Sequence, residues 1–163
     1  MSRFTISITA SPADIDELGH VNNAVWVQWI QRIATTHWEA VAPPEHVAAY
    51  VWVVTRHEMD YRGNVVEGET VTGETWVPEG PKGARFDRHV RFTGSDGRVK
   101  VEAVTTWALL DRATGRLLRV RPEIAAVSDL GLFANRLRAI RATCRESGVN
   151  FPLLCISNGR ANR

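Results

Sequence analysis

Polar side chains that could do chemistry gather in residues 14–23, directly before the clearest helical pattern of the chain. This segment reads Asp-Ile-Asp-Glu-Leu-Gly-His-Val-Asn-Asn. The start of a helix carries backbone N–H groups without an intrahelical acceptor and a partial positive charge, and both suit a developing oxyanion. An aspartate a few residues upstream is ionised at neutral pH, so it could attack a carbonyl carbon or activate a water molecule. The spacing also fits an ordinary turn followed by a helix cap.

Each polar residue of this loop has a functional and a structural interpretation. Asp16 is either the catalytic carboxylate or a cap for the turn over residues 17–19, whereas Asp14 is expected to hold the loop through Asx-type hydrogen bonds. Gly19 suits a turn with positive φ, and in a functional site it would also let a substrate approach the backbone. His20 is a further candidate catalytic residue that would bond Asp16 or line the site, and its alternative role is structural.

The helix start supplies the remaining candidates. Asn22 and Asn23 are good N-cap residues, because an Asn side chain can accept a hydrogen bond from a first-turn N–H. In a catalytic site Asn22 would contact the substrate, and the backbone N–H of Asn23 would bind the oxyanion. Trp26 follows on the apolar side of the helix, where it forms either core or the wall of a substrate pocket.

The helix that positions these groups is expected over residues 24–41. Apolar residues and one histidine recur there at steps of three and four, which is typical of a helix packed along one face. Pro43 and Pro44 are expected to end it. The apolar stripe consists of Trp26, Trp29, Ile30, Ile33, Ala34, His37, Trp38 and Val41.

Strand patterns surround this helix. Hairpin-length loops between them favour antiparallel pairing, and Arg88 interrupts one otherwise apolar strand face. The predicted fold class is α+β, with one long helix packed on a curved antiparallel sheet of about five to six strands. The strands are expected over residues 4–10, 50–61, 69–77, 85–93, 99–110 and 116–120.

Composition narrows the class of protein. The 163 residues are 44% hydrophobic and 23% charged, which suits a globular domain and excludes a disordered or collagen-like chain. No long apolar run predicts a membrane-spanning helix, and the first residues lack the apolar core of a secretory signal. Cys144 and Cys155 match no metal-ligand spacing, so we expect no metal site and a cytoplasmic protein.

The end of the chain differs in charge from the rest. Residues 136–163 contain six arginines and one acidic residue, whereas residues 1–135 are mildly acidic. We divide the chain into a domain of residues 1–127 and an Arg-rich extension of residues 128–163. Apolar residues at helical spacing predict a basic helix over 128–145. It would pack on a neighbouring subunit, although its charge would also suit anionic lipid or nucleic acid.

The loop and the helix also carry a family resemblance. The run DIDELGHVNNAVWVQW, followed by a Trp-containing helix and then strands, resembles the 4-hydroxybenzoyl-CoA thioesterase group of hot-dog-fold proteins. The strand that ends in Glu58-Met-Asp60-Tyr61 looks like the second strand of this family. The resemblance covers roughly residues 4–122. His20 stands where the 4-hydroxybenzoyl type has an apolar residue, which favours a different acyl group.

The resemblance implies an assembly and an activity. The sheet would wrap the long helix of a hot-dog fold, and the chain would form a homodimer or homotetramer with active sites at the dimer interface. The second acid of the D-x-D motif falls on Asp16, which would act as base or nucleophile. The oxyanion donor of the family falls on the backbone N–H of Asn23. The implied reaction is hydrolysis of acyl-CoA or acyl-carrier-protein thioesters without a cofactor.

Three other functions stay open at this point. A dehydratase of the same fold would pair a histidine with an acid, as His20 stands near Asp16, but no separate hydratase-type segment is present. A non-catalytic protein that binds acyl thioesters would not need the charge of Asp16. A nucleic-acid binder would depend on the basic tail and would show steep salt dependence. Thioester hydrolysis, without nucleic acid as a partner, is the main prediction.

Overall fold

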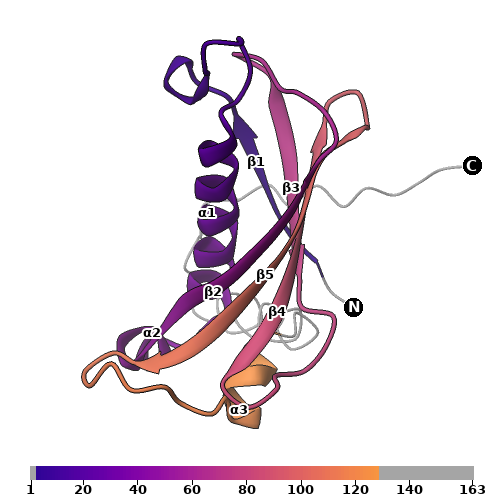
Figure 1. Cartoon of the computed structure of the whole chain (residues 1–163). Coiled ribbons are helices and arrows are strands. Elements are labelled where there is room, and N and C mark those ends of the chain that lie inside the picture. The colour runs from indigo at the N-terminus through magenta and orange to yellow at the C-terminus, as the bar shows by residue number, and fades with distance from the viewer. Residues whose placement is uncertain (1–2, 129–163) are drawn as a thin grey trace, which may run out of the picture.

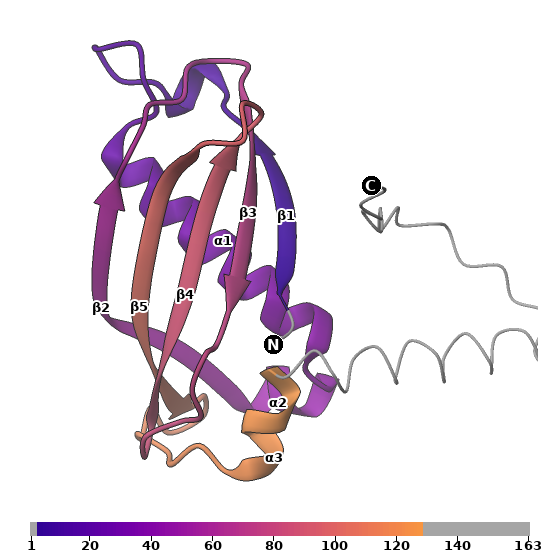
Figure 2. The same ribbon diagram turned by 90° about the vertical axis from the view of Figure 1, so that its right-hand side faces the viewer.

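The computed structural model describes residues 3–128, which form an antiparallel sheet and a long helix. The strand order across the sheet is β1-β3-β4-β5-β2, and every pair of neighbours is antiparallel. The long strands twist and bend together as one layer (Figures 1 and 2). The strands are β1 (Phe4–Thr9), β2 (Tyr50–Tyr61), β3 (Thr70–Trp76), β4 (Arg85–Gly94) and β5 (Val99–Asp111).

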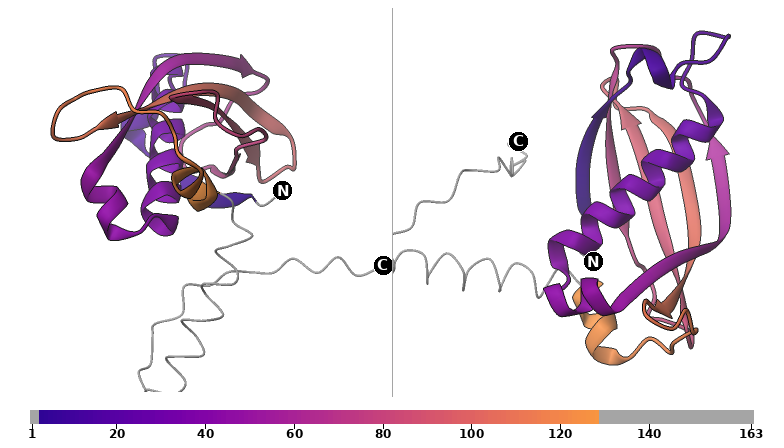
Figure 3. Two further views of the ribbon diagram at one scale, coloured as in Figure 1. Left: turned by 90° about the horizontal axis from the view of Figure 1, so that it is seen from below. Right: turned by 90° about the vertical axis from the view of Figure 1, so that its left-hand side faces the viewer.

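Helix α1 (Asn23–Val41) lies across one face of this sheet. Figure 3 shows the helix running obliquely over the strands, with the sheet curving around it. Its buried side chains are those of the predicted stripe, except that Val25 joins them and Trp38 is only half-buried. The α+β class, with one long helix on a curved sheet of five strands, is confirmed. Within residues 3–128 no helix is both long and apolar enough to cross a membrane.

Aromatic rings fill the core between α1 and the sheet. Trp26 packs edge-on against Trp29 with ring centroids 4.9 Å apart, and the two rings lie 5.4 and 6.1 Å from Phe92 of β4. Gly73 of β3 makes room for this packing, because a Cβ atom there would lie 2.8 Å from the Phe92 ring and 3.2 Å from Ile33. Burial of such large apolar surfaces is the main stabilising contribution to a domain of this size.

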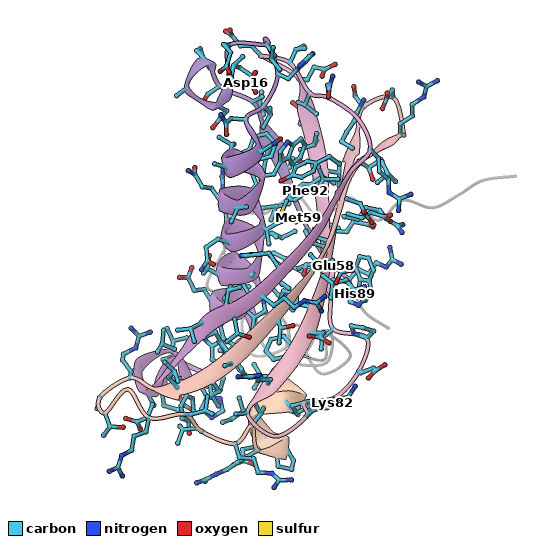
Figure 4. The ribbon with its side chains drawn as sticks, viewed as in Figure 1. Asp16, Glu58, Met59, Lys82, His89 and Phe92 are labelled. Carbon is cyan, nitrogen blue, oxygen red and sulfur yellow. The ribbon has the colours of Figure 1, made fainter. Side chains whose placement is uncertain are left out.

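The two faces of the sheet differ in polarity. Figure 4 shows Phe92 and Met59 in the space between the sheet and α1, with Glu58 and His89 on the other side of the sheet. That other face carries ion pairs, such as the one between Arg91 and Glu102, whose Nη2 and Oε1 atoms lie 2.7 Å apart. Alternation along the strands therefore directs apolar side chains toward the helix and charged ones toward solvent.

The predicted last strand over residues 116–120 is wrong. Leu117 makes only an isolated bridge to the sheet. Val120 and Ile124 are instead buried against Leu109, so this segment closes one end of the core and does not extend the sheet. The chain then continues into α3 (Pro122–Ala125) and a 3₁₀ helix (Ala126–Ser128).

Two further short helices are absent from the sequence prediction. Helix α2 (Pro44–Ala49) follows α1 directly, although Pro43 and Pro44 predict only a helix end and then a strand. A proline in the first turn is compatible with a new helix, because its missing N–H would have no intrahelical acceptor there. A 3₁₀ helix at Pro12–Asp14 begins in the same way. The predicted basic helix over 128–145 lies almost wholly outside the described residues.

Candidate active site

The loop between β1 and α1 folds into a tight turn. Ile15 and Val21 form an antiparallel bridge, and the N–H of Asp16 donates to the carbonyl oxygen of His20 at 2.9 Å. Gly19 closes the turn with a φ of 78°, and its N–H donates to the carbonyl oxygen of Asp16 at 3.0 Å. The predicted positive φ at Gly19 is confirmed, and it is a conformation that a side chain would disfavour.

Two backbone N–H groups orient the half-buried carboxylate of Asp16. Its Oδ1 accepts hydrogen bonds from the N–H of Leu18 at 2.9 Å and of His20 at 3.3 Å. The side chain therefore caps the turn, as one of the two interpretations of the sequence expected. Among the described residues, Oδ2 has no hydrogen-bond partner, so one carboxylate oxygen is fixed while the other is available. Figure 4 shows Asp16 at the end of the molecule where α1 begins.

Further hydrogen bonds fix the loop on both sides of the turn. The N–H of Val21 donates to the carbonyl oxygen of Val65 at 2.8 Å, and the N–H of Asn22 donates to the carbonyl oxygen of Asp14 at 2.9 Å. The Asp14 Oδ2 accepts from both the N–H and the hydroxyl of Ser11, at 2.8 and 2.7 Å. Asp14 is thus a structural residue, as predicted, and the position of the turn ahead of the helix is fixed.

The first turn of α1 leaves one backbone donor open. The side chain of Asn22 caps the helix by accepting a hydrogen bond from the N–H of Ala24 at 2.8 Å. The N–H of Val25 donates to the carbonyl oxygen of Asn22 at 2.9 Å. Asn23 is the first helical residue and is exposed, and its N–H has no hydrogen-bond acceptor within residues 3–128. This N–H is therefore a free hydrogen-bond donor at the end of the helix that carries a partial positive charge.

The His20 side chain does not bond to the carboxylate of Asp16. Its Nε2 lies 3.3 Å from the Nδ2 of Asn64, in the loop between β2 and β3. The backbone of His20, by contrast, makes two hydrogen bonds with Asp16. Sequence reasoning missed Asn64, because nothing in the pattern around it indicates contact with a residue 44 positions earlier.

Trp26 lies in the hydrophobic core, where it is 2% exposed. Its proposed contact with substrate stays a prediction. Gly19 and Asn22 are exposed beside Asn23, so the backbone around the helix start is accessible. Two cavities of about 350 and 180 Å³ within residues 3–128 are lined by other residues, so neither encloses Asp16. In the described part of the chain, no group of three His, Cys, Asp or Glu side chains is arranged to hold a metal ion.

Comparison with known proteins identifies the family. Residues 10–127 match the family described as the thioesterase-like superfamily. The chain belongs to this superfamily. The expected membership of a hot-dog thioesterase family is thereby confirmed, and it supports thioester hydrolase activity.

Three proteins similar to this superfamily member are each 26% identical to it or less. The acyl-[acyl-carrier-protein] hydrolase FATB3 of Cuphea viscosissima is 26% identical over 74 residues, which are 45% of this chain and 18% of that protein. The 1,4-dihydroxy-2-naphthoyl-CoA thioesterase Slr0204 of Synechocystis has a TM-score of 0.67 at 13% identity, over 80% of this chain and 98% of that one. SAV2348 of Staphylococcus aureus, solved in complex with CoA, has a TM-score of 0.68 at 13% identity, over 77% and 81%. These two structures show a shared fold.

Proposed function

We propose that this superfamily member hydrolyses acyl thioesters of coenzyme A or acyl-carrier protein, with Asp16 as its catalytic carboxylate. One observation carries the proposal. The Asp16 carboxylate is oriented by two N–H groups in a loop that leads directly into the open start of α1. The substrate class is supported by similar proteins, which include an acyl-carrier-protein hydrolase and an acyl-CoA thioesterase.

Two chemical routes are open to Asp16. In the first, its carboxylate removes a proton from water while the water oxygen attacks the thioester carbonyl carbon. In the second, the carboxylate itself attacks, and water then hydrolyses the resulting anhydride. In both routes the C–S bond breaks, its electron pair leaves with sulfur, and the products are a free acid and a thiol. Because a thiolate is a good leaving group, no strong general acid is required.

The backbone N–H of Asn23 would stabilise the oxyanion formed on the carbonyl oxygen. This donor is exposed and open, and it lies at the positive end of a helix of 19 residues. Loss of one such donor typically costs roughly 100- to 1000-fold in turnover. Gly19, Asn22 and His20 lie around the same loop, so we assign them contacts with the thioester and its carrier.

A second copy of the chain would complete the site. Asp16 is half-buried and Leu18 beside it is 73% exposed, so the loop of one chain is open to solvent. Strand β2 has 12 residues and forms an edge of the sheet, where its unpaired backbone groups suit pairing with another strand. We propose a homodimer, or a homotetramer built from it, whose partner supplies further walls of the substrate pocket. The reaction needs no cofactor, and we propose the cytoplasm as its compartment.

A thiol-release assay tests the function. Purified protein is given a panel of acyl-CoA and acyl-carrier-protein thioesters, and wild type is compared with Asp16→Asn. This change keeps the shape of the side chain and removes its charge, so kcat should fall by roughly 100-fold or more. Glu17→Gln is the matched control, because it removes a charge from the exposed neighbouring residue and should leave turnover unchanged.

The outcomes separate the remaining functions. Turnover by Asp16→Asn at the wild-type rate would reject Asp16 as the catalytic group. No thiol release from any member of the panel would reject hydrolysis and favour a protein that only binds acyl thioesters.

A further inference from the structure

A buried arginine lies under the C-terminal half of α1. Arg88 of β4 is 4% exposed, on the sheet face that packs against the helix. Its Nη1 donates to the Thr75 hydroxyl at 3.1 Å and lies 2.9 Å from Nδ1 of His37. Thr75 comes from β3 and His37 from α1, so the guanidinium is held from two sides by neutral groups.

No carboxylate neutralises this arginine within the described residues. None of the ion pairs there includes Arg88. Burial lowers the pKa of Arg88 to about 10, which still leaves it charged at neutral pH. Burial and the nearby Arg88 lower the pKa of His37 to about 3, so the imidazole is neutral and its Nδ1 accepts the hydrogen bond. A buried cation without an anion is costly, and a bound anion would offset that cost.

Arg88 also lines a cavity between α1, β2 and β5. The cavity has a volume of about 180 Å³. A cavity of roughly 150 Å³ holds a benzene molecule, so this space suits a ring or a short chain. Glu39 and Arg112 also line the cavity, and their opposite charges offset each other. The buried charge of Arg88 therefore makes the interior of the cavity positive. The apolar walls are Trp38, Trp52, Phe86 and Trp107.

This cavity is distant from the start of α1 in the same chain. Gln31, the first residue of α1 that lines it, follows Asn23 by eight residues, or about 12 Å along the helix axis. Tyr50, at the start of β2 after α2, lines it from the other side. Figure 1 shows α2 and the start of β2 at the end of the molecule away from the β1–α1 loop. The Arg88 cavity and the Asp16 loop are thus separate regions of one chain.

We propose that the Arg88 cavity binds a small organic carboxylate with a compact apolar body. The carboxylate would pair with the guanidinium, whose planar donors match two carboxylate oxygens, and the ring or chain would contact the tryptophan walls. The carboxylate has two possible sources. It is either a free acid or the far end of an acyl group that is esterified at its other end. Only the second source rests on the proposed hydrolase function. A short acyl chain cannot span the separation between this cavity and the Asp16 loop of the same chain, so its thioester would lie at the corresponding loop of a second copy in the proposed homodimer.

Binding to the wild-type protein is the first test. Benzoate and hexanoate are compared with benzamide and hexanamide, which have the same shape without the charge. Binding is followed by tryptophan fluorescence, because three tryptophans line the cavity, and by the rise in melting temperature. We expect each acid to bind at least about tenfold more tightly than its amide, since charge-assisted pairs are the stronger ones. Equal affinity of acid and amide, or no binding of either, would overturn the proposal.

A variant then assigns the binding to Arg88. Arg88→Met removes the charge and leaves an unbranched apolar side chain. It should lose the preference for acids over amides. Arg85→Met is the matched control, because Arg85 is exposed on the same strand and should keep the preference. Retention of the preference by a folded Arg88→Met protein would contradict the assignment.

A final comparison distinguishes the two sources. Thiol release is measured for adipyl-CoA and for hexanoyl-CoA, which differ in the terminal carboxylate. A wild-type preference for adipyl-CoA of about tenfold in kcat/KM, lost in Arg88→Met, identifies the acyl group as the source. Acid binding without this preference identifies a free acid. Because the binding assay needs no turnover, failure of hydrolysis would leave the Arg88 test intact.

Discussion

The two ends of α1 hold their polar groups in opposite surroundings. Around its start, Asp16 is half-buried and Asn23 is exposed, and two backbone N–H groups orient the Asp16 carboxylate. Toward its other end, Arg88 and His37 are 4% and 1% exposed and contact each other inside the core. A charge near water needs only orientation, whereas a charge removed from water needs a partner. We therefore propose catalysis at the first end and capture of an anion at the second.

The largest effect on turnover is expected when the backbone N–H of Asn23, at the start of α1, is removed. Asn23→Pro deletes the proposed oxyanion N–H, while proline is favoured at the first position of a helix. We expect kcat to fall by roughly 100- to 1000-fold with little change in stability. Asn23→Ala keeps the N–H and should retain turnover close to that of wild type. Equal turnover of the two variants in the thiol-release assay would show that this donor does not bind the oxyanion.

Acid should destabilise the second end through His37. The folded protein keeps His37 neutral down to a pKa of about 3, whereas the unfolded chain protonates it below about 6.5. Acid therefore favours the unfolded state, and His37 should cost about 1 kcal/mol of stability per pH unit as pH falls from 6 to 4. His37→Gln keeps an acceptor for Arg88 without this titration. Urea unfolding at several pH values should show that the free energy of unfolding falls more steeply with acid in wild type than in His37→Gln. The same pH dependence in both proteins would contradict this prediction.

The smallest effect concerns the helix cap. Asn22→Ala removes the acceptor for the N–H of Ala24, so the free energy of unfolding should fall by about 1 kcal/mol. Asn22→Ser restores a capping oxygen and should recover most of that loss. Urea denaturation of wild type and the two variants measures both changes. An Asn22→Ala protein with the same free energy of unfolding as wild type would mean that the cap does not stabilise α1.

The first end is predictable from sequence because its interactions are local. The Asp16 turn, the positive φ of Gly19 and the cap at Asn22 all involve residues within a few positions of one another. Spacing and side-chain chemistry are therefore enough to predict them. The same holds for α1 and the five strands, whose periodicities are strong.

The second end needs the folded chain. Arg88 interrupts an apolar pattern in the sequence, but its contacts come from residues 13 and 51 positions away, on β3 and α1. The contact of His20 with Asn64 is similarly distant. The strand predicted over residues 116–120 is wrong for a similar reason. Its conformation depends on burial of Val120 against Leu109, which is a tertiary contact. No periodicity encodes such tertiary pairings.

One measurement tests most directly whether catalysis depends on Asp16 and carboxylate binding depends on Arg88. Asp16→Asn and Arg88→Met are each assayed for hexanoyl-CoA turnover and for benzoate binding. We predict that Asp16→Asn loses turnover by roughly 100-fold and binds benzoate like wild type, while Arg88→Met keeps turnover and loses the preference for benzoate over benzamide. Turnover by Asp16→Asn at the wild-type rate, or loss of both properties in either folded variant, would contradict this account.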